Sequence, residues 1–137
     1  MSVKPFFDTN IPIYAFSEDD PRTEVARVLL ATGGIISVQV LNELTNVLRR
    51  KLKFGWKEVK EALDALRVLC PSVTSITPET HEKALQIAER YGYRIYDSLI
   101  IAAALAAKST TLYSEDMNDG QVIENVLTIR NPFQNNK

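Results

Sequence analysis

The sequence contains one cysteine, one histidine, five glycines and six prolines among its 137 residues. The single cysteine, Cys70, excludes an internal disulfide and a cysteine-rich zinc site. Because Cys70 precedes Pro71 at the end of an apolar segment, we expect it to be a small buried hydrophobic residue. The few glycines and prolines disfavour long disordered linkers. The length and the 45% hydrophobic content predict one folded domain over residues 1–137.

An excess of charge of one sign and a long apolar run are also missing. The formal net charge is −1, which excludes a strongly basic nucleic-acid coat protein but permits a nucleic acid bound at a metal site. Residues 1–5 lack the apolar run of a signal peptide, and the apolar stretch 99–107 is too short to cross a bilayer. We therefore expect a soluble cytoplasmic protein. The absence of a Gly-rich phosphate loop disfavours nucleotide binding of the Walker or dinucleotide kind.

Short apolar strands alternate with amphipathic helices along the chain. Asp20-Pro21 and Thr77-Pro78 are typical helix starts, and Gly33 and Gly92 are typical helix ends. The predicted strands are 3–7, 35–38, 73–76, 110–113 and 126–130, and the predicted helices are a turn after 11–13 and the segments 21–33, 40–52, 56–69, 78–92 and 97–107. This alternation predicts an α/β fold, a three-layer α/β/α sandwich with a central parallel sheet.

Four acidic residues, Asp8, Glu43, Asp97 and Asp116, stand near the end of a predicted strand or the start of a predicted helix. Asp8 and Asp116 follow strands, Glu43 is one turn into a helix, and Asp97 begins a helix that returns antiparallel to the strands. All four therefore fall at the carboxyl edge of the sheet, where α/β sheets form their sites. Close carboxylates repel unless a cation neutralises them. Oxygen-only donors select Mg²⁺ or Mn²⁺, and such ions support phosphodiester hydrolysis.

Each acid taken alone has a simpler interpretation. Asp8 could form a turn, and Asp97 could be an acid in the first turn of a helix that the helix dipole favours. Glu43 could face solvent, and Asp116 could shape its loop. Their occurrence together in one compatible topology favours a shared site.

The sequence resembles the PIN-domain family, and within it the VapC-type toxin ribonucleases, over essentially the whole chain. The resemblance is carried by the segments Phe7-Asp8-Thr9-Asn10, Ser37 to Glu43, Tyr96-Asp97-Ser98-Leu99-Ile100 and Leu112 to Gly120. It implies an α/β/α sandwich and a Mg²⁺ or Mn²⁺ site. The implied ligands and catalytic residues are Asp8, Glu43, Asp97 and Asp116.

The same resemblance implies supporting residues and partners. Asn10 and Ser114 would be polar companions that position ligands or water, and Asp119 would be an additional acid near the site. The implied activity is metal-dependent endonucleolytic cleavage of RNA. The implied partners are an RNA substrate, a second copy in a homodimer and a cognate antitoxin protein.

Two surface features leave alternatives open. Arg49-Arg50-Lys51, with Lys53 and Lys57, could bind RNA, or could be a solvated helix end where cations are favoured. The apolar segment Ile11–Phe16 could form a partner groove, although core packing is favoured for such residues.

We interpret the chain as a single-domain toxin ribonuclease. The main alternative is a non-catalytic PIN-like scaffold that binds RNA or protein. A receiver-like or phosphatase-like α/β domain is disfavoured because it needs a lysine near the end of a later strand, whereas Lys108 precedes its strand.

Overall fold

The computed structural model describes residues 3–134. Its strands are β1 (Phe6–Phe7), β2 (Ile35–Ser37), β3 (Ser72–Thr74), β4 (Thr111–Tyr113), β5 (Val122–Ile123) and β6 (Leu127–Arg130), and its helices are α1 (Asn10–Phe16), α2 (Thr23–Thr32), α3 (Val38–Arg50), α4 (Trp56–Leu69), α5 (Pro78–Tyr91) and α6 (Ile95–Ala106). The predicted alternation of strands and helices is confirmed.

Within the described residues the strands form one sheet of order β3-β2-β1-β4-β6-β5. Neighbouring strands are parallel except β5 and β6, which are antiparallel. β1 lies centrally, because Phe6 is in register with Ile35 of β2 on one side and with Leu112 of β4 on the other. The chain moves outward from β1 to β3 and then returns to β4, so the strand order reverses between β1 and β4. Crevices for ligands form at such a point of an α/β sheet.

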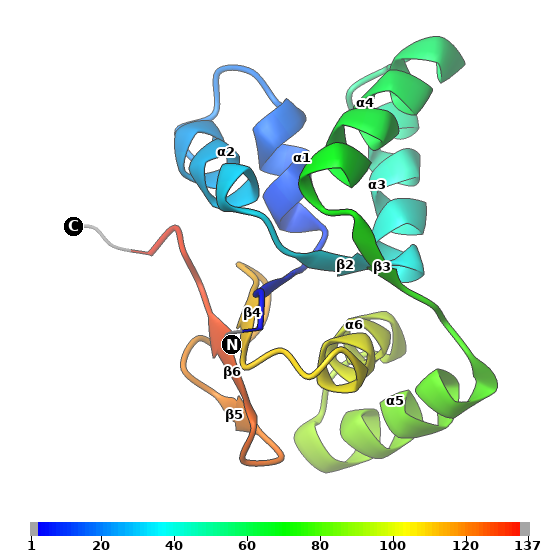
Figure 1. Cartoon of the computed structure of the whole chain (residues 1–137), viewed down its shortest axis with the longest axis vertical. Helices are drawn as coiled ribbons and strands as arrows, with labels where there is room; N and C mark the ends of the chain where they lie inside the picture. Colours follow the sequence, from blue (N-terminus) through cyan, green and yellow to red (C-terminus); the bar gives the residue numbers. More distant parts are fainter. Residues whose placement is uncertain (1–2, 135–137) are drawn as a thin grey trace.

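Helices cover both faces of the sheet, with α1 to α4 on one side and α5 and α6 on the other (Figure 1). α1 packs on α2, α3 on α4 and α5 on α6. Because the sheet lies between two layers, Phe6, Phe7, Ile36 and Leu112 are fully buried. The predicted three-layer α/β/α sandwich with a central, mostly parallel sheet is confirmed.

Side-chain caps account for several helix boundaries. Thr77 accepts a 3.1 Å hydrogen bond from the backbone N–H of Thr80, and Gly92 ends α5 with a φ of 81°. Ser37 accepts a 3.3 Å bond from the N–H of Val40, so α3 begins at Val38. The prediction placed this start at residue 40. The helix begins two residues earlier because Ser37, the last residue of β2, also serves as its cap.

Other elements also differ from the prediction. β3 spans Ser72–Thr74 rather than 73–76, and α6 begins at Ile95 rather than at residue 97. β1 begins at Phe6 rather than residue 3, and Pro5 just before it has no N–H to donate to a neighbouring strand. α2 begins at Thr23, because Asp20 accepts the N–H of Arg22 at 2.8 Å and forms a separate turn. β5 was not predicted. It adds an antiparallel strand to the edge, and Val122 within it is 49% exposed.

Core packing explains two of the sequence expectations. Cys70 is fully buried, as expected. Ile11 is also fully buried, and Ile13, Tyr14 and Phe16 are partly buried against the core, so the interpretation of this segment as core is confirmed. Among the described residues, no helix is both long and apolar enough to cross a membrane.

Gly34, directly before β2, allows a close approach to β1. A Cβ atom at this position would overlap the ring of Phe7. The missing side chain therefore makes the space that seats Phe7, the residue directly before Asp8.

Candidate active site

Asp8 follows β1 and points its carboxylate into the crevice beside β4. The residue is only 3% exposed. One carboxylate oxygen accepts the backbone N–H of Thr9 at 2.6 Å. The other accepts the hydroxyl of Ser114 at 2.6 Å and the side-chain amide of Asn10 at 3.2 Å. Three donors from two segments therefore fix the position of this acid.

Burial raises the pKa of Asp8 from 3.8 to about 7. The bonds from Ser114 and Thr9 act in the opposite direction, and the negative charges of Asp97 and Glu43 raise the pKa further. Desolvation therefore outweighs the hydrogen bonds. A nearby cation would lower the pKa of Asp8, because its charge would offset the effects of both the desolvation and the repulsion.

Asp116 stands in the loop after β4 and is tied to the start of α1. The side-chain amide of Asn10 donates to Asp116 at 3.3 Å, and the side-chain oxygen of Asn10 accepts the N–H of Glu115 at 3.2 Å. The N–H of Asp116 donates to the hydroxyl of Ser114 at 3.2 Å. Asn10 and Ser114 thus each bond both Asp8 and the 114–116 loop.

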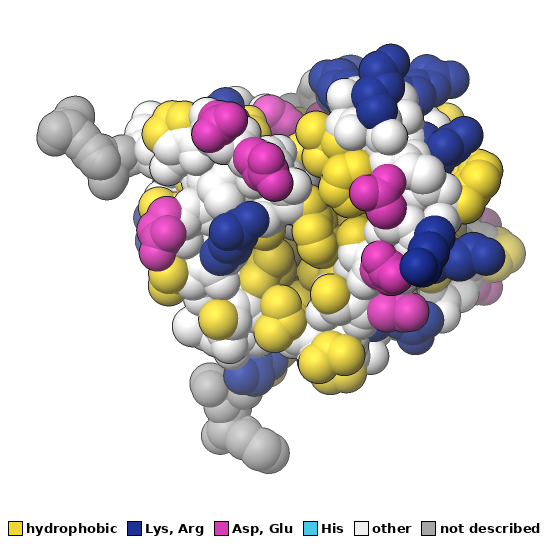
Figure 2. Space-filling model, turned by 90° about the horizontal axis from the view of Figure 1, so that it is seen from above, with side chains coloured by type: hydrophobic (Ala, Val, Ile, Leu, Met, Phe, Trp, Pro, Cys, Tyr) yellow, Lys and Arg dark blue, Asp and Glu magenta, His cyan; other side chains and the backbone are white. Residues whose placement is uncertain are grey.

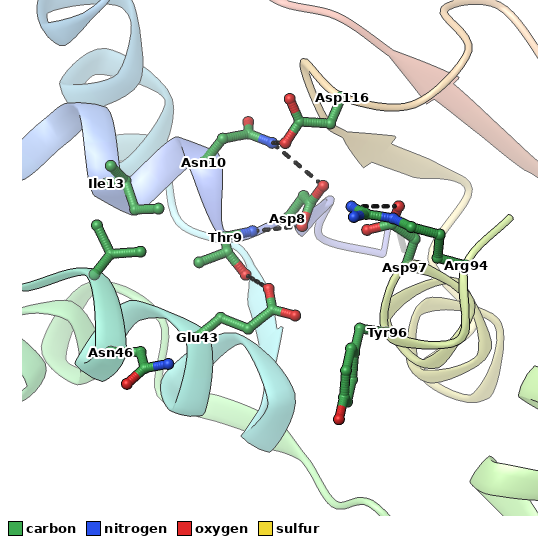
Figure 3. A pocket seen from close by; sticks show the side chains of 11 residues that line it. Asp8, Thr9, Asn10, Ile13, Glu43, Asn46, Arg94, Tyr96, Asp97 and Asp116 are labelled. Carbon is green, nitrogen blue, oxygen red and sulfur yellow. Dashed lines mark hydrogen bonds and ion pairs between the residues drawn. The ribbon is translucent and has the colours of Figure 1, made fainter. Parts of the chain in front are cut away.

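Glu43 reaches the same crevice from α3. The hydroxyl of Thr9 donates to one carboxylate oxygen of Glu43 at 2.6 Å, and the amide of Gln39 donates to the other at 3.0 Å. Gln39 lies one helical turn before Glu43, so both project from the same face of α3. These bonds hold the Glu43 carboxylate toward Asp8 (Figure 3).

Asp97 lies in the first turn of α6, on the opposite side of the crevice. Burial raises its pKa, the adjacent Arg94 guanidinium lowers it, and the charges of Glu43 and Asp116 raise it again. The Arg94 guanidinium lies 3.4 Å from the Asp97 carboxylate, but the Arg94 side chain is 85% exposed. Such an exposed ion pair compensates the buried charge weakly.

The four acids surround one pocket of about 370 Å³ (Figure 3). Its lining consists of Asp8, Thr9, Asn10, Ile13, Glu43, Asn46, Val47, Arg94, Tyr96, Asp97 and Asp116. Ser114 is fully buried behind Asp8. Asp119 lies outside the lining, where its carboxylate accepts the N–H of Asn131 at 2.8 Å. The structure therefore brings together the four predicted acids with Asn10 and Ser114, and leaves Asp119 outside.

The donor chemistry of the pocket suits a hard cation. Four carboxylates face one guanidinium, and oxygen donors of this kind select Mg²⁺ or Mn²⁺. Within residues 3–134, however, no three Asp, Glu, His or Cys side chains are arranged closely enough to hold an ion. Binding therefore requires the carboxylates to move inward. The repulsion among them opposes such a movement, and a bound cation would offset it.

Several residues in or next to the pocket were not predicted from the sequence. Thr9 and Gln39 orient Glu43, and Asn46 and Tyr96 form opposite walls of the opening. Gln39 was detectable from its spacing of one helical turn before Glu43. The positions of Asn46 and Tyr96 depend on how α3 and α6 face each other.

The predicted basic segment does not line this pocket. The guanidinium of Arg49, at the far end of α3, lies 4.4 Å from the centre of the Trp56 ring. Lys53 and Lys57 are exposed. Figure 2, which looks onto the layer of α1 to α4, shows Lys and Arg side chains gathered along one border and hydrophobic side chains in the hollow between the two pairs of helices.

The fold and the pocket define an α/β/α protein with an acidic site at the switch point of a mostly parallel sheet. The sequence model of the PIN domain family matches residues 6–118. The chain belongs to the PIN domain family. No curated protein matches it in sequence.

Solved structures with the same fold include three from bacterial toxin systems. The toxin VapC20 of Mycobacterium tuberculosis, described as cleaving the sarcin-ricin loop, is 22% identical with a TM-score of 0.67, covering 82% of this chain and 89% of that chain. A toxin-antitoxin complex of Klebsiella pneumoniae is 20% identical with a TM-score of 0.72, covering 94% and 98%. VapBC2 of Rickettsia felis, bound to a DNA fragment from its promoter, is 23% identical with a TM-score of 0.65, covering 92% and 96%.

Proposed function

We propose that this chain, acting as a single PIN domain over residues 1–137, is a divalent-metal-dependent endoribonuclease and the toxin component of a toxin–antitoxin pair. The observation that carries the proposal is the convergence of four carboxylates on one pocket. Asp8 is buried there beside Asp97 and Glu43, whose charges raise its pKa. Such an arrangement is costly for stability and is typical of functional sites.

In this proposal Asp8, Glu43, Asp97 and Asp116 hold Mg²⁺ or Mn²⁺. A bound ion of this kind supplies an activated water and neutralises charge on the phosphate oxygens. The pocket offers many oxygen donors and only one positively charged neighbour, and a hard divalent ion binds to such a set of donors.

The remaining polar residues position these acids. Ser114 and Asn10 hold Asp8 and the 114–116 loop, while Thr9 and Gln39 hold Glu43. Fixed donors of this type keep catalytic groups within the narrow range of geometry that the reaction tolerates. Asp119, which binds the backbone of Asn131, is assigned to shaping the loop.

The substrate and partners of the proposal rest on different observations. Arg94 stands at the mouth of the pocket with its guanidinium exposed, in a position to contact a phosphate near the acids. The toxin–antitoxin complexes of the same fold support a cognate antitoxin protein as partner. We further propose that the chain acts in the cytoplasm and forms a homodimer.

RNA cleavage with added Mn²⁺ or Mg²⁺ tests the proposal. The purified wild type is compared with Asp8→Asn and Asp97→Asn, with an EDTA control and with Asp64→Asn as a matched control. Asp64 is exposed on α4 and lies outside the acidic pocket. We expect wild type and Asp64→Asn to cut, and the two pocket variants and the chelated sample to lose cutting by at least about a hundredfold.

The alternative function is a non-catalytic PIN-like scaffold that binds RNA or protein. A folded wild type that neither binds Mn²⁺ by calorimetry nor cuts structured or unstructured RNA would replace the proposal with this alternative. Cutting that persists in EDTA would instead contradict the role of the metal.

A further inference from the structure

A second groove lies beside the acidic pocket and has a different chemical character. It encloses about 430 Å³ and is lined by Gln39, Asn42, Glu43, Asn46 and Tyr96. Glu43, Asn46 and Tyr96 also line the acidic pocket, so the two spaces are continuous. Its volume lies within the range of small-ligand sites.

One face of α3 supplies three amides to this groove. Gln39, Asn42 and Asn46 follow a helical spacing of three and four residues, which places them on one side of the helix. Gln39 is nearly buried and bonds Glu43, whereas Asn42 and Asn46 are exposed. Each amide presents two N–H donors and one acceptor oxygen, so the face can bond both kinds of group on a ligand.

Tyr96 forms the opposite wall of the groove. It is 60% exposed, although it is large and aromatic and lies directly before Asp97. In Figure 3 the Tyr96 side chain stands across the opening from Asn46, with Glu43 between them. An exposed ring beside a polar helix face offers a flat surface on which a planar group can stack.

The charges of the groove disfavour a phosphate as its occupant. No Lys or Arg belongs to the described residues that line it, and Glu43 contributes a carboxylate. Of the two uncharged parts of a nucleotide, the nucleobase rather than the ribose is planar, and it therefore matches the exposed ring of Tyr96 as well as the amides. Amide side chains bond base edges, and aromatic rings stack on base faces.

We propose that this groove is a nucleobase subsite, in which one base stacks on Tyr96 and presents its edge to Asn42 and Asn46 while the neighbouring phosphate enters the acidic pocket. This inference rests on the proposed ribonuclease function and specifies its substrate. A base inside an A-form helix is stacked between its neighbours, so only an unpaired base can enter. The subsite therefore requires an unpaired base next to the phosphate that enters the acidic pocket.

Binding of short oligonucleotides, measured by fluorescence anisotropy, tests the subsite apart from catalysis. The probes are hexauridine, hexacytidine, hexaadenosine and a hexamer of abasic ribose phosphates, and an Asp116→Asn background limits cleavage. All four probes carry the same backbone charge, so the electrostatic part of binding cancels in the comparison. We expect the protein to bind at least one base-bearing hexamer about tenfold more tightly than the abasic hexamer.

Variants then assign this preference to Tyr96. Tyr96→Ala should reduce the preference to about twofold or less, and Tyr96→Phe, which keeps the ring, should retain it. Asn46→Ala should alter the ranking of the three bases, because it removes an edge contact. Trp56→Ala is the matched control, since Trp56 is 58% exposed on α4 and lies outside the groove.

The outcomes separate this inference from the proposed function. Equal binding of abasic and base-bearing hexamers, or a preference that survives Tyr96→Ala, would overturn the subsite while RNA cutting by the wild type still stood. Failure to bind any hexamer, together with failure to cut RNA, would overturn both.

Discussion

Ser114 donates a 2.6 Å hydrogen bond to Asp8 across a sequence separation of 106 residues. Both side chains are buried, and they meet because Phe7 of β1 is in register with Tyr113 of β4. The pairing of these two strands thus sets the position of the most buried acid of the site.

Replacing Ser114 by alanine should lower the stability of the protein and raise the pKa of Asp8. The change removes a donor that lowers the pKa of Asp8, so the pKa of Asp8 should rise above about 7. We expect a loss of about 1–3 kcal/mol in the free energy of unfolding, measured in urea. Ser75→Ala, at an exposed loop position, is the control and should change stability by less than about 0.5 kcal/mol. Equal effects of the two substitutions would contradict the role of this bond.

Stability without metal should fall as the pH rises from about 4 to about 7. The pKa of Asp8 is raised from 3.8 to about 7 in the folded state, so the folded protein binds more protons than the unfolded chain in this interval. The stabilisation is complete below pH 3.8 and is lost as the pH passes about 7, an effect of up to about 4 kcal/mol. Urea titrations in EDTA at several pH values should show that the free energy of unfolding of Asp8→Asn falls less steeply with pH than that of the wild type. Asp97, whose pKa is also raised, would account for the remainder.

A divalent cation should reverse this trend. Carboxylates must be deprotonated to hold a metal, so Mn²⁺ should stabilise the protein more at about pH 8 than at about pH 5.5. At a concentration of about one hundred times Kd, the expected rise in Tm at the higher pH is roughly 10 °C. Glu43→Gln should lessen this rise, and Asp64→Asn should not. A rise that is independent of pH would indicate binding outside the acidic pocket.

Arg22 should contribute to the placement of the 114–116 loop. Its guanidinium lies 4.0 Å from the centre of the Tyr14 ring, 3.0 Å from Glu115 and 2.9 Å from Asp20. Arg22→Ala should cost about 1 kcal/mol of stability, because these contacts are partly exposed. A double-mutant cycle with Glu115→Gln measures the coupling, and additive effects would show that the ion pair contributes nothing.

Gly34→Ala should destabilise the protein through Phe7. The added Cβ overlaps the Phe7 ring, and overpacking of this kind costs about 1–3 kcal/mol. Gly55→Ala is the matched control, because a Cβ there meets only Glu58 at 3.7 Å. We also expect Gly34→Ala to lower cleavage at temperatures where the variant is still folded, since a displaced Phe7 moves Asp8. Full activity of the folded variant would contradict this coupling.

Much of the fold was predictable because its signals are local. α4 spans Trp56–Leu69 as predicted from its apolar periodicity, and the Thr77 cap and Gly92 mark the ends of α5. β5 was not predictable, since it has two residues and only Ile123 is buried. Its strand geometry comes from pairing with β6.

The acids were predictable for a different reason. Rules of α/β topology place Asp8 and Asp116 after parallel strands and Asp97 at the start of a returning helix, so their meeting needs no knowledge of packing. The groove beside them had no such signal. Asn46 and Tyr96 come from separate helices, and only the packing of the whole molecule brings them to the same opening.

The acidic pocket draws on both helical layers and on the central strands, from Asp8 near one end of the sequence to Asp116 near the other. A fragment that ends before β4 would therefore lack an essential part of the pocket. β4 must pair with β1 before Ser114 reaches Asp8. The pocket therefore cannot assemble in a chain that has been synthesised only as far as α6.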